Sequence, residues 1–365
     1  MAPDNSPATP PRPRRPWLFP LCLLIAAMAA IVALTLSDAY LPHDLEHLGM
    51  RRPAPGSAGV PWGALLNNLA LAAACGLYAL PVLGMAGLLV AGGFNWALFG
   101  AFMCADVAIV VSWACATDDF SHFCYAYGLG IPACGLFFGA LGGLFAGRLG
   151  WGVNRAGLLT LSLGFALGFG LSFCLVELRG DTTWKPLFSW PEVAVATAAM
   201  LLFVWWLLSR SSIGRKLRAI GADAKAARLA GVDRGWAMFV AFALSAVGAV
   251  LFWFNLLLLD HEPFFVWFDW FANLIGIGYV RLPREMDVVV TTLPCTLPFL
   301  AIVACGGGLS GRGRVSLAAL LCAALAVPML DCVLSWAPIH AVPWLRQWAM
   351  PLLIIVGTLV HWRRD

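Results

Sequence analysis

Two carboxylates stand inside apolar runs of the sequence, where an ionisable group could relay a proton or bind a cation. Asp106 and Asp331 each lie in a segment long and apolar enough to cross a bilayer. A carboxylate in hydrocarbon is costly, so such residues usually face a bundle interior or a water-filled cavity. The alternative is a structural role, with each carboxyl neutral or hydrogen-bonded to a neighbouring helix. Both roles stay open for Asp331, and the structural one is favoured for Asp106.

Asparagines in similar segments are less costly polar groups. Asn68 and Asn255, together with Asn67, could line a pathway for a polar solute. Side-chain amides in membrane helices more often form hydrogen bonds between helices. We therefore expect Asn68 and Asn255 either on a pathway with the two carboxylates or at helix contacts.

A serine between glycines suggests nucleophilic hydrolysis. Gly308-Leu309-Ser310-Gly311 matches the GxSG pattern of rhomboid-type intramembrane serine proteases, in which a distant histidine would act as the base. Ser310 is predicted at a cytoplasmic edge, His340 outside, and His361 at the boundary of the last apolar run. Neither histidine is placed to meet Ser310 at a shared buried depth, so a protease is disfavoured.

Histidines and cysteines form no pattern that predicts a metal or cofactor site. His43 and His47 are four residues apart, but without further ligands nearby they are expected to be surface histidines. The 11 cysteines lie mostly in apolar runs without CxxC spacing, as small core residues do. Cys115 and Cys124 flank one predicted outer loop, so a disulfide between them stays open.

The composition excludes a soluble globular protein. Hydrophobic residues make up 61% of the 365 residues and charged residues only 12%, which predicts an all-α polytopic membrane protein. We expect about ten transmembrane helices, each predicted to within a few residues. They are residues 17–37, 62–83, 96–116, 125–147, 158–176, 193–208, 236–259, 288–305, 315–335 and 344–360.

Charge predicts the orientation of these helices. With both termini cytoplasmic, most of the 23 lysines and arginines fall in inner loops and most of the 19 acids in outer loops, as the positive-inside rule requires. Residues 84–95 are Gly-rich and are expected to form a broken or re-entrant segment buried in protein. Residues 260–287 are predicted to form a periplasmic loop rich in aromatic residues, which suits a membrane interface or a receptor contact.

The N-terminal region is expected to add a tail and one helix. Residues 1–16 are Pro-rich and basic, which predicts a disordered cytoplasmic tail. Residues 17–38 follow as an extra N-terminal transmembrane helix. Ser37-Asp38-Ala39 also allows cleavage as a signal peptide, but the length of the apolar run favours an uncleaved anchor.

Residues 209–235, here called the cationic segment, separate two apolar runs. Apolar and small residues recur at spacings of three and four, which predicts an amphipathic helix at the cytoplasmic surface. An ordinary solvated loop is the alternative, and charge alone favours it. The basic residues are Arg210, Arg215, Lys216, Arg218, Lys225, Arg228 and Arg234.

The order of residues in this segment resembles the coupling loop of branched-chain amino acid ABC importer permeases. The resemblance rests on residues 214–221, GRKLRAIG, followed by Ala226-Ala227 and Gly231. It implies a short helix that docks into a groove of a cytoplasmic ATPase and that Gly231 ends. Lys225 stands where many members carry an acid. The implied coupling residues are Gly214, Arg215, Lys216, Arg218, Ala226, Ala227 and Gly231.

Other stretches are similar to the same family. They include residues 76–84, 87–102 and 158–162, and the turn 304–311, so that the resemblance covers a permease domain over residues 62–361. Val90-Ala91-Gly92-Gly93-Phe94 stands where the family usually has a longer stretch with polar side chains.

The resemblance implies the transmembrane permease subunit of an ATP-driven importer for branched-chain or related amino acids, multi-pass in the bacterial inner membrane. It implies cytoplasmic ATPase subunits, a second identical or homologous permease and a periplasmic binding protein as partners; nucleic acid is not expected. The chain lacks G-x-x-x-x-G-K-[ST], so we expect no enzyme activity of its own, and ATP would be used by the partner. A secondary transporter using Asp106 or Asp331 explains the acids but not the cationic segment.

Overall fold

A computed structural model provides the structure of the chain. It describes residues 16–36, 62–94, 101, 104, 124–179, 190–259, 298–308, 315–336 and 343–362. Every regular element in these ranges is a helix, which confirms the predicted all-α class for this part of the chain. Some predicted features lie outside the described residues, namely the N-terminal tail, Asp106, Cys115, Ser310 and the loop 260–287.

Most described helices coincide with predicted spans to within a few residues, whereas most of the predicted span 96–116 and the first part of span 288–305 lie outside the described residues. The helices are α1 (Leu18–Leu36), α2 (Trp62–Ala79), the 3-10 helix η2 (Leu80–Met85), α3 (Ala86–Val90), the π-helical turns η3 (Cys124–Gly130) and η4 (Gly143–Arg148) on either side of α6 (Ile131–Gly142), α7 (Val153–Arg179), α8 (Trp190–Arg210), α9 (Ser212–Ala222), α10 (Ala224–Leu229), α11 (Arg234–Leu259), α14 (Leu317–Trp336) and α15 (Pro343–Trp362). A further helical stretch covers residues 298–305.

Three of the described helical stretches are long and apolar enough to cross a bilayer: Leu18–Leu36, Gly128–Arg148 and Arg234–Phe252. Thr197–Arg210 meets the same criterion together with Ser212–Ala222, from which it is bent by 68°. These helices are those of a membrane protein, while the number of about ten spans stays a prediction.

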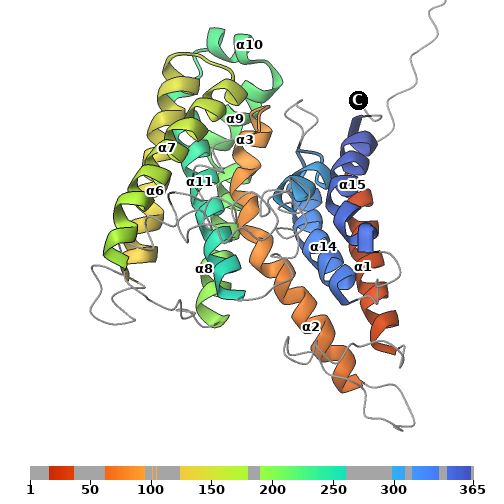
Figure 1. The fold of residues 1–365 in the computed structure, drawn as a ribbon. Coiled ribbons are helices and arrows are strands. Elements are labelled where there is room, and N and C mark those ends of the chain that lie inside the picture. The colour runs from red at the N-terminus through yellow and green to blue at the C-terminus, as the bar shows by residue number, and fades with distance from the viewer. Residues whose placement is uncertain are drawn as a thin grey trace, which may run out of the picture.

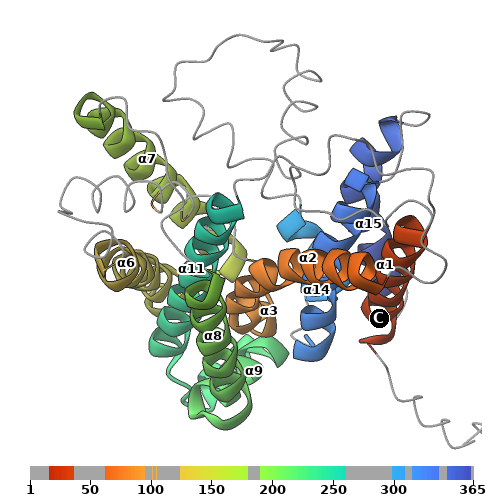
Figure 2. The same ribbon diagram turned by 90° about the horizontal axis from the view of Figure 1, so that it is seen from below.

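Helix α2 runs between two groups of helices (Figure 1). On one side lie α6, α7, α8 and α11, with α9 and α10 at their end; on the other side lie α1, α14 and α15, as Figure 2 also shows. A small apolar cluster joins Ala27 and Ile31 of α1 to Ala72 of α2 and to Met329 and Val333 of α14. The N-terminal helix α1 therefore packs as part of the bundle.

The Gly-rich stretch after α2 begins as a continuation of the helix. Helices η2 and α3 carry the chain onward from α2 towards α9 (Figure 1). Residues 80–91 are all buried, so protein surrounds the irregular backbone of η2, as a low-dielectric environment requires. Residues 80–90 are helical throughout, and 91–94 form a turn and an irregular segment. A broken or re-entrant segment over 84–95 stays a prediction, because the chain beyond residue 94 lies outside the described residues up to residue 101.

Glycines let α11 approach its neighbours closely. A Cβ atom at Gly248 of α11 would collide with the carbonyl oxygen of Pro81, and Gly248 also faces Gly84 of η2. A Cβ atom at Gly147 would lie 2.5 Å from the Cα atom of Gly235. Small residues commonly allow such backbone contacts between membrane helices. Helix α11 is thus fixed against both η2 and η4 by contacts that no larger residue can make.

We expect Gly248→Ala to destabilise the protein, because the added methyl group meets backbone atoms that cannot rotate away. Overpacking of this kind costs about 1–3 kcal/mol. The control is Gly63→Ala in α2, where nothing lies within 4 Å of the added atom and the better helix propensity of alanine should be neutral or stabilising. Thermal unfolding in detergent measures both; an equal midpoint for the two variants would contradict the packing.

Candidate functional site

The chain leaves α8 and enters α9 through a capped bend at Ser211. The Ser211 hydroxyl donates to the carbonyl oxygen of Leu207 at 2.6 Å and accepts from the amide of Gly214 at 3.1 Å. Serine in this position satisfies an otherwise unpaired amide at the start of a helix. The bend of 68° turns the chain from an apolar helix into one that carries charges on one side.

Helix α9 has one buried face and one charged face. Leu217 and Ile220 are buried, whereas Arg215 and Arg218 are exposed and Lys216 is half-buried. The Arg218 guanidinium donates to the carbonyl oxygen of Leu208, which ties α9 back to the end of α8. The predicted amphipathic helix is therefore present, and Arg215 is the arginine that leaves its charge unengaged by the described residues.

Backbone contact joins α9 to α3. A Cβ atom at Gly221 would collide with the carbonyl oxygen of Val90, so only glycine permits this approach. One turn earlier in α9, Leu217 packs against Gly87 of α3: a Cβ atom added to Gly87 would lie 3.5 Å from the Leu217 side chain. The charged helix is thereby attached to a segment that is buried throughout.

Helix α10 begins at Asp223, which the sequence reasoning did not single out. Its carboxylate accepts from the amides of Lys225 at 2.8 Å and Ala226 at 3.0 Å. These two bonds favour the ionised form and lower the pKa of the fully exposed Asp223 below its usual value. Acid therefore weakens this cap as pH falls through the lowered pKa.

Helix α10 ends at Leu229, and Gly231 follows its C-cap residue Ala230. The single short helix that the resemblance implied is therefore two helices, because Asp223 ends α9 and caps α10. Gly231 has φ +75°, and the amides of Gly231 and Val232 donate to the carbonyl oxygens of Arg228 and Ala227. This pattern is the Schellman motif, for which glycine is the preferred residue. Ala227 is buried and Ala226 exposed, while Leu229 is 90% exposed. Leu229 is thus the most exposed of the large apolar side chains that the structure describes.

The coupling residues predicted from the sequence are thus brought together, but the predicted pathway residues are not shown as one site. Asn68 is buried in α2 and donates to the hydroxyl of Thr35 in α1 at 3.2 Å. Asp331 is buried in α14. Asn255 lies in α11, with its side chain outside the description, and Asp106 is not described. The contact of Asn68 is of the interhelical kind that the sequence analysis named as the alternative.

Beyond α3, contacts continue towards the chain ends. Leu89 of α3 packs against Gly308: a Cβ atom added to Gly308 would lie 2.9 Å from the Leu89 side chain. The adjacent Gly307 lies under the ring of His361, whose Nε2 atom is 3.0 Å from the carbonyl oxygen of Cys305. His361 also contacts Phe19 of α1 edge to face. The start of α1 and the end of α15 therefore lie at the same end of the bundle as α9.

Sequence reasoning missed the partners of this site because they act through backbone atoms. Val90 contributes its carbonyl oxygen, which any residue type supplies, and Gly221 contributes the absence of a side chain. The signal that was available is the spacing of Gly214 and Gly221 on the buried side of α9. Among the described residues, no three His, Cys, Asp or Glu side chains gather as metal ligands do.

Comparisons with known proteins place the chain in a family of membrane permeases. A family model described as the permease component of branched-chain amino acid transport systems matches residues 65–252. A solved inward-facing structure, assigned to a metal-chelate type ABC transporter, aligns with 93% of this chain and 99% of its own at 14% sequence identity and a TM-score of 0.42. The search of curated proteins found no match.

We expect Gly221→Val to detach α9 from α3, since the valine side chain cannot occupy the place of the Val90 carbonyl. A cost of about 1–3 kcal/mol raises the population of the detached helix by a factor of about 5 to 150. Limited trypsin digestion, which cuts after Arg215 and Arg218, should therefore speed up by about the same factor.

The matched control for this digestion is Gly231→Asn. Asparagine tolerates positive φ, and nothing lies within 4 Å of the added atom. Its cleavage rate should equal that of the wild type. Equal rates in all three proteins would show that α9 does not depend on the Gly221 contact.

Proposed function

We propose that this chain, which belongs to the family of branched-chain amino acid transport permease components, acts as the ATPase-coupled transmembrane subunit of an ABC importer. The family match covers more than half of the chain and includes the whole cationic segment. The observation that carries the proposal is the pair α9 and α10, a capped and amphipathic unit whose outer face is exposed with respect to the residues that the structure describes.

The cationic segment is the proposed docking element for the ATPase. Its outer face offers Arg215 for an acidic partner and Leu229 for an apolar pocket, both exposed. On its inner face, Leu217 and Gly221 pack against α3. A displacement of α9 by nucleotide-dependent motion of the ATPase would therefore reach buried α3 without a flexible link in between.

The cytoplasmic side of the protein is proposed to be the end at which α9 lies. Positive charges gather in the cationic segment, as the positive-inside rule requires of a cytoplasmic loop. The described ends of α1 and α15 share this end of the bundle through Phe19 and His361. We propose on the same basis that α1 is a retained anchor, because its cluster with α2 and α14 would be exposed by cleavage.

The remaining assignments follow from membership of the family. We propose a bacterial inner-membrane location, a second permease subunit beside this one, a periplasmic binding protein that delivers substrate, and branched-chain or related amino acids as cargo. ATP would bind to the partner subunits rather than to this chain. Asp331 and the other predicted pathway residues stay candidates for contact with the cargo.

We expect the tagged protein to copurify with an ATPase subunit in mild detergent and Leu229→Glu/Arg215→Glu to lose most of that subunit. Docking anchors of this kind are worth at least about 2 kcal/mol, which weakens binding by roughly thirtyfold. Leu229 is 90% exposed, so its replacement leaves the permease folded. Quantitative mass spectrometry of the purified complex gives the ratio of the two subunits.

Arg155→Glu is the control for this experiment. Arg155 is exposed at the start of α7 and lies outside the cationic segment, so its variant should retain the ATPase. If the folded wild-type protein brings down no nucleotide-binding subunit, the importer proposal fails. Asp331 would then be the first residue to test in a secondary transporter.

A further inference from the structure

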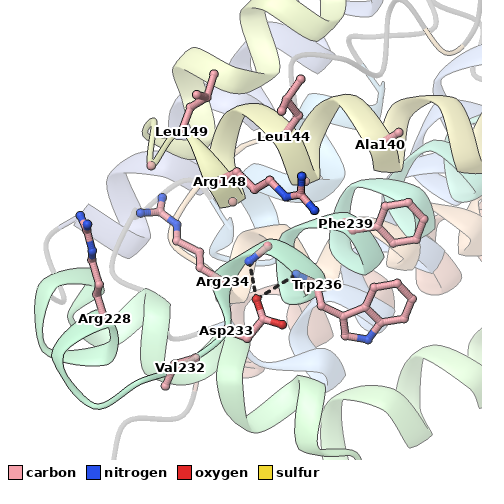
Figure 3. Close-up of a pocket in the computed structure, with 14 residues that line it drawn as sticks. Ala140, Leu144, Arg148, Leu149, Arg228, Val232, Asp233, Arg234, Trp236 and Phe239 are labelled. Carbon is pink, nitrogen blue, oxygen red and sulfur yellow. Dashed lines mark hydrogen bonds between the residues drawn. The ribbon is translucent and has the colours of Figure 1, made fainter.

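We propose that a cleft between η4 and the start of α11 binds the phosphate of an anionic phospholipid headgroup. The cleft has a volume of about 920 Å³ and lies between the end of α6–η4, the loop after η4, the end of α10 and the first turns of α11 (Figure 3). Three of its lining residues are arginines: Arg148, Arg228 and Arg234.

The positive charge of this cleft is not neutralised by the described residues. The only carboxylate among the lining residues, Asp233, accepts from the amides of Gly235 at 3.0 Å and Trp236 at 3.4 Å and so caps α11 (Figure 3). No carboxylate whose side chain the structure describes forms an ion pair with the three arginines. A bound anion would offset the charge of these arginines.

Arg234 is built into the wall of the cleft. Its Nη2 atom donates to the carbonyl oxygen of Trp151 at 2.8 Å, which fixes the guanidinium. Its Nε atom is buried and has no hydrogen-bond partner among the described residues. A buried donor without a partner is costly, and a phosphate oxygen is an acceptor that could satisfy it, since Arg recognises phosphate through several N–H groups.

The position of the cleft identifies the source of the phosphate. It lies where the candidate membrane span Gly128–Arg148 ends and the candidate span Arg234–Phe252 begins. These two ends are in contact, and each carries an arginine. The same cleft exposes apolar side chains, including Leu144 and the indole of Trp236, which stacks on Phe239. Arginines at the ends of spans and exposed apolar rings one turn further in match a phosphate at the interface with acyl chains below it.

Alternative occupants fit these features less well. Inorganic phosphate would use the arginines but leave Leu144 and Trp236 exposed to water. An acidic loop of the ATPase would need a polar surface around the charges. A second copy of the chain would cover the apolar residues but presents arginines to the same arginines across a symmetric contact. Helix α6 lies at the outer edge of the bundle (Figure 2), where lipid has access.

The test uses the full-length permease without its ATPase, so that its outcome does not depend on the coupling proposal. The protein is purified from a mixture of phosphatidylglycerol and phosphatidylcholine, and retained lipids are counted by native mass spectrometry. Arg148→Gln/Arg228→Gln should reduce retained phosphatidylglycerol by about thirtyfold, since each arginine near the surface contributes roughly a factor of five. Arg234 is left in place because it holds the Trp151 carbonyl.

Arg155→Gln/Lys225→Gln is the control, because it removes the same charge from exposed residues that do not line the cleft. It should leave lipid retention unchanged. An equal loss in both double variants, or equal retention of the two lipids by the wild type, contradicts a specific site. If the cleft double variant does not fold, Arg228→Gln alone, at the exposed end of α10, should still lower retention severalfold.

Two further measurements distinguish a bound lipid from the other possible occupants of the cleft. Inorganic phosphate that displaces phosphatidylglycerol from the wild type overturns the lipid assignment in favour of a free phosphate. Loss of a dimer from the same spectra in Arg148→Gln/Arg228→Gln, with lipid retention unchanged, overturns it in favour of a contact between copies. Retention that depends on Arg148 and Arg228 and resists inorganic phosphate supports the lipid site.

Discussion

The structure depends on one contact that contains no side chain, between Gly221 of α9 and the carbonyl oxygen of Val90. The charges of the cationic segment favour a polar surface, yet its helix α9 packs against the buried helix α3. A glycine resolves this conflict, since it lets a charged helix touch the backbone of a buried one. Leu217 fills the space one turn earlier, so the two helices meet along a line rather than at a point.

Close backbone contacts at glycines recur along the bundle. Gly248 meets the carbonyl oxygen of Pro81, and Gly147 meets Gly235. Leu89 of α3 packs on Gly308, next to the glycine that lies under His361. When one helix moves, a contact between backbone atoms forces its neighbour to move with it. A contact through long side chains would instead adapt by a change of rotamer. Helix α3 thus lies where motion of α9 can be distributed to both groups of helices.

Apolar length and charge predicted most helices within a few residues, because burial in lipid demands both. The bend at Ser211 and the cap at Asp223 depend on local hydrogen bonds, whose residue types occur throughout the chain. The cationic cleft joins Arg148 to Arg234, which are far apart in the sequence, so no local pattern reveals it. Asn68 forms a helix contact through its bond to Thr35, and its role on a pathway stays a prediction.

The central claim, that the outer face of α9 and α10 docks on an ATPase, is tested most directly by photo-crosslinking in the cell. A photoreactive amino acid at Leu229, which is 90% exposed, should yield an adduct with a nucleotide-binding subunit, and one at Arg155 should not. An adduct at Leu229 with lipid alone, or with nothing, while the protein is folded in the membrane, would contradict the account.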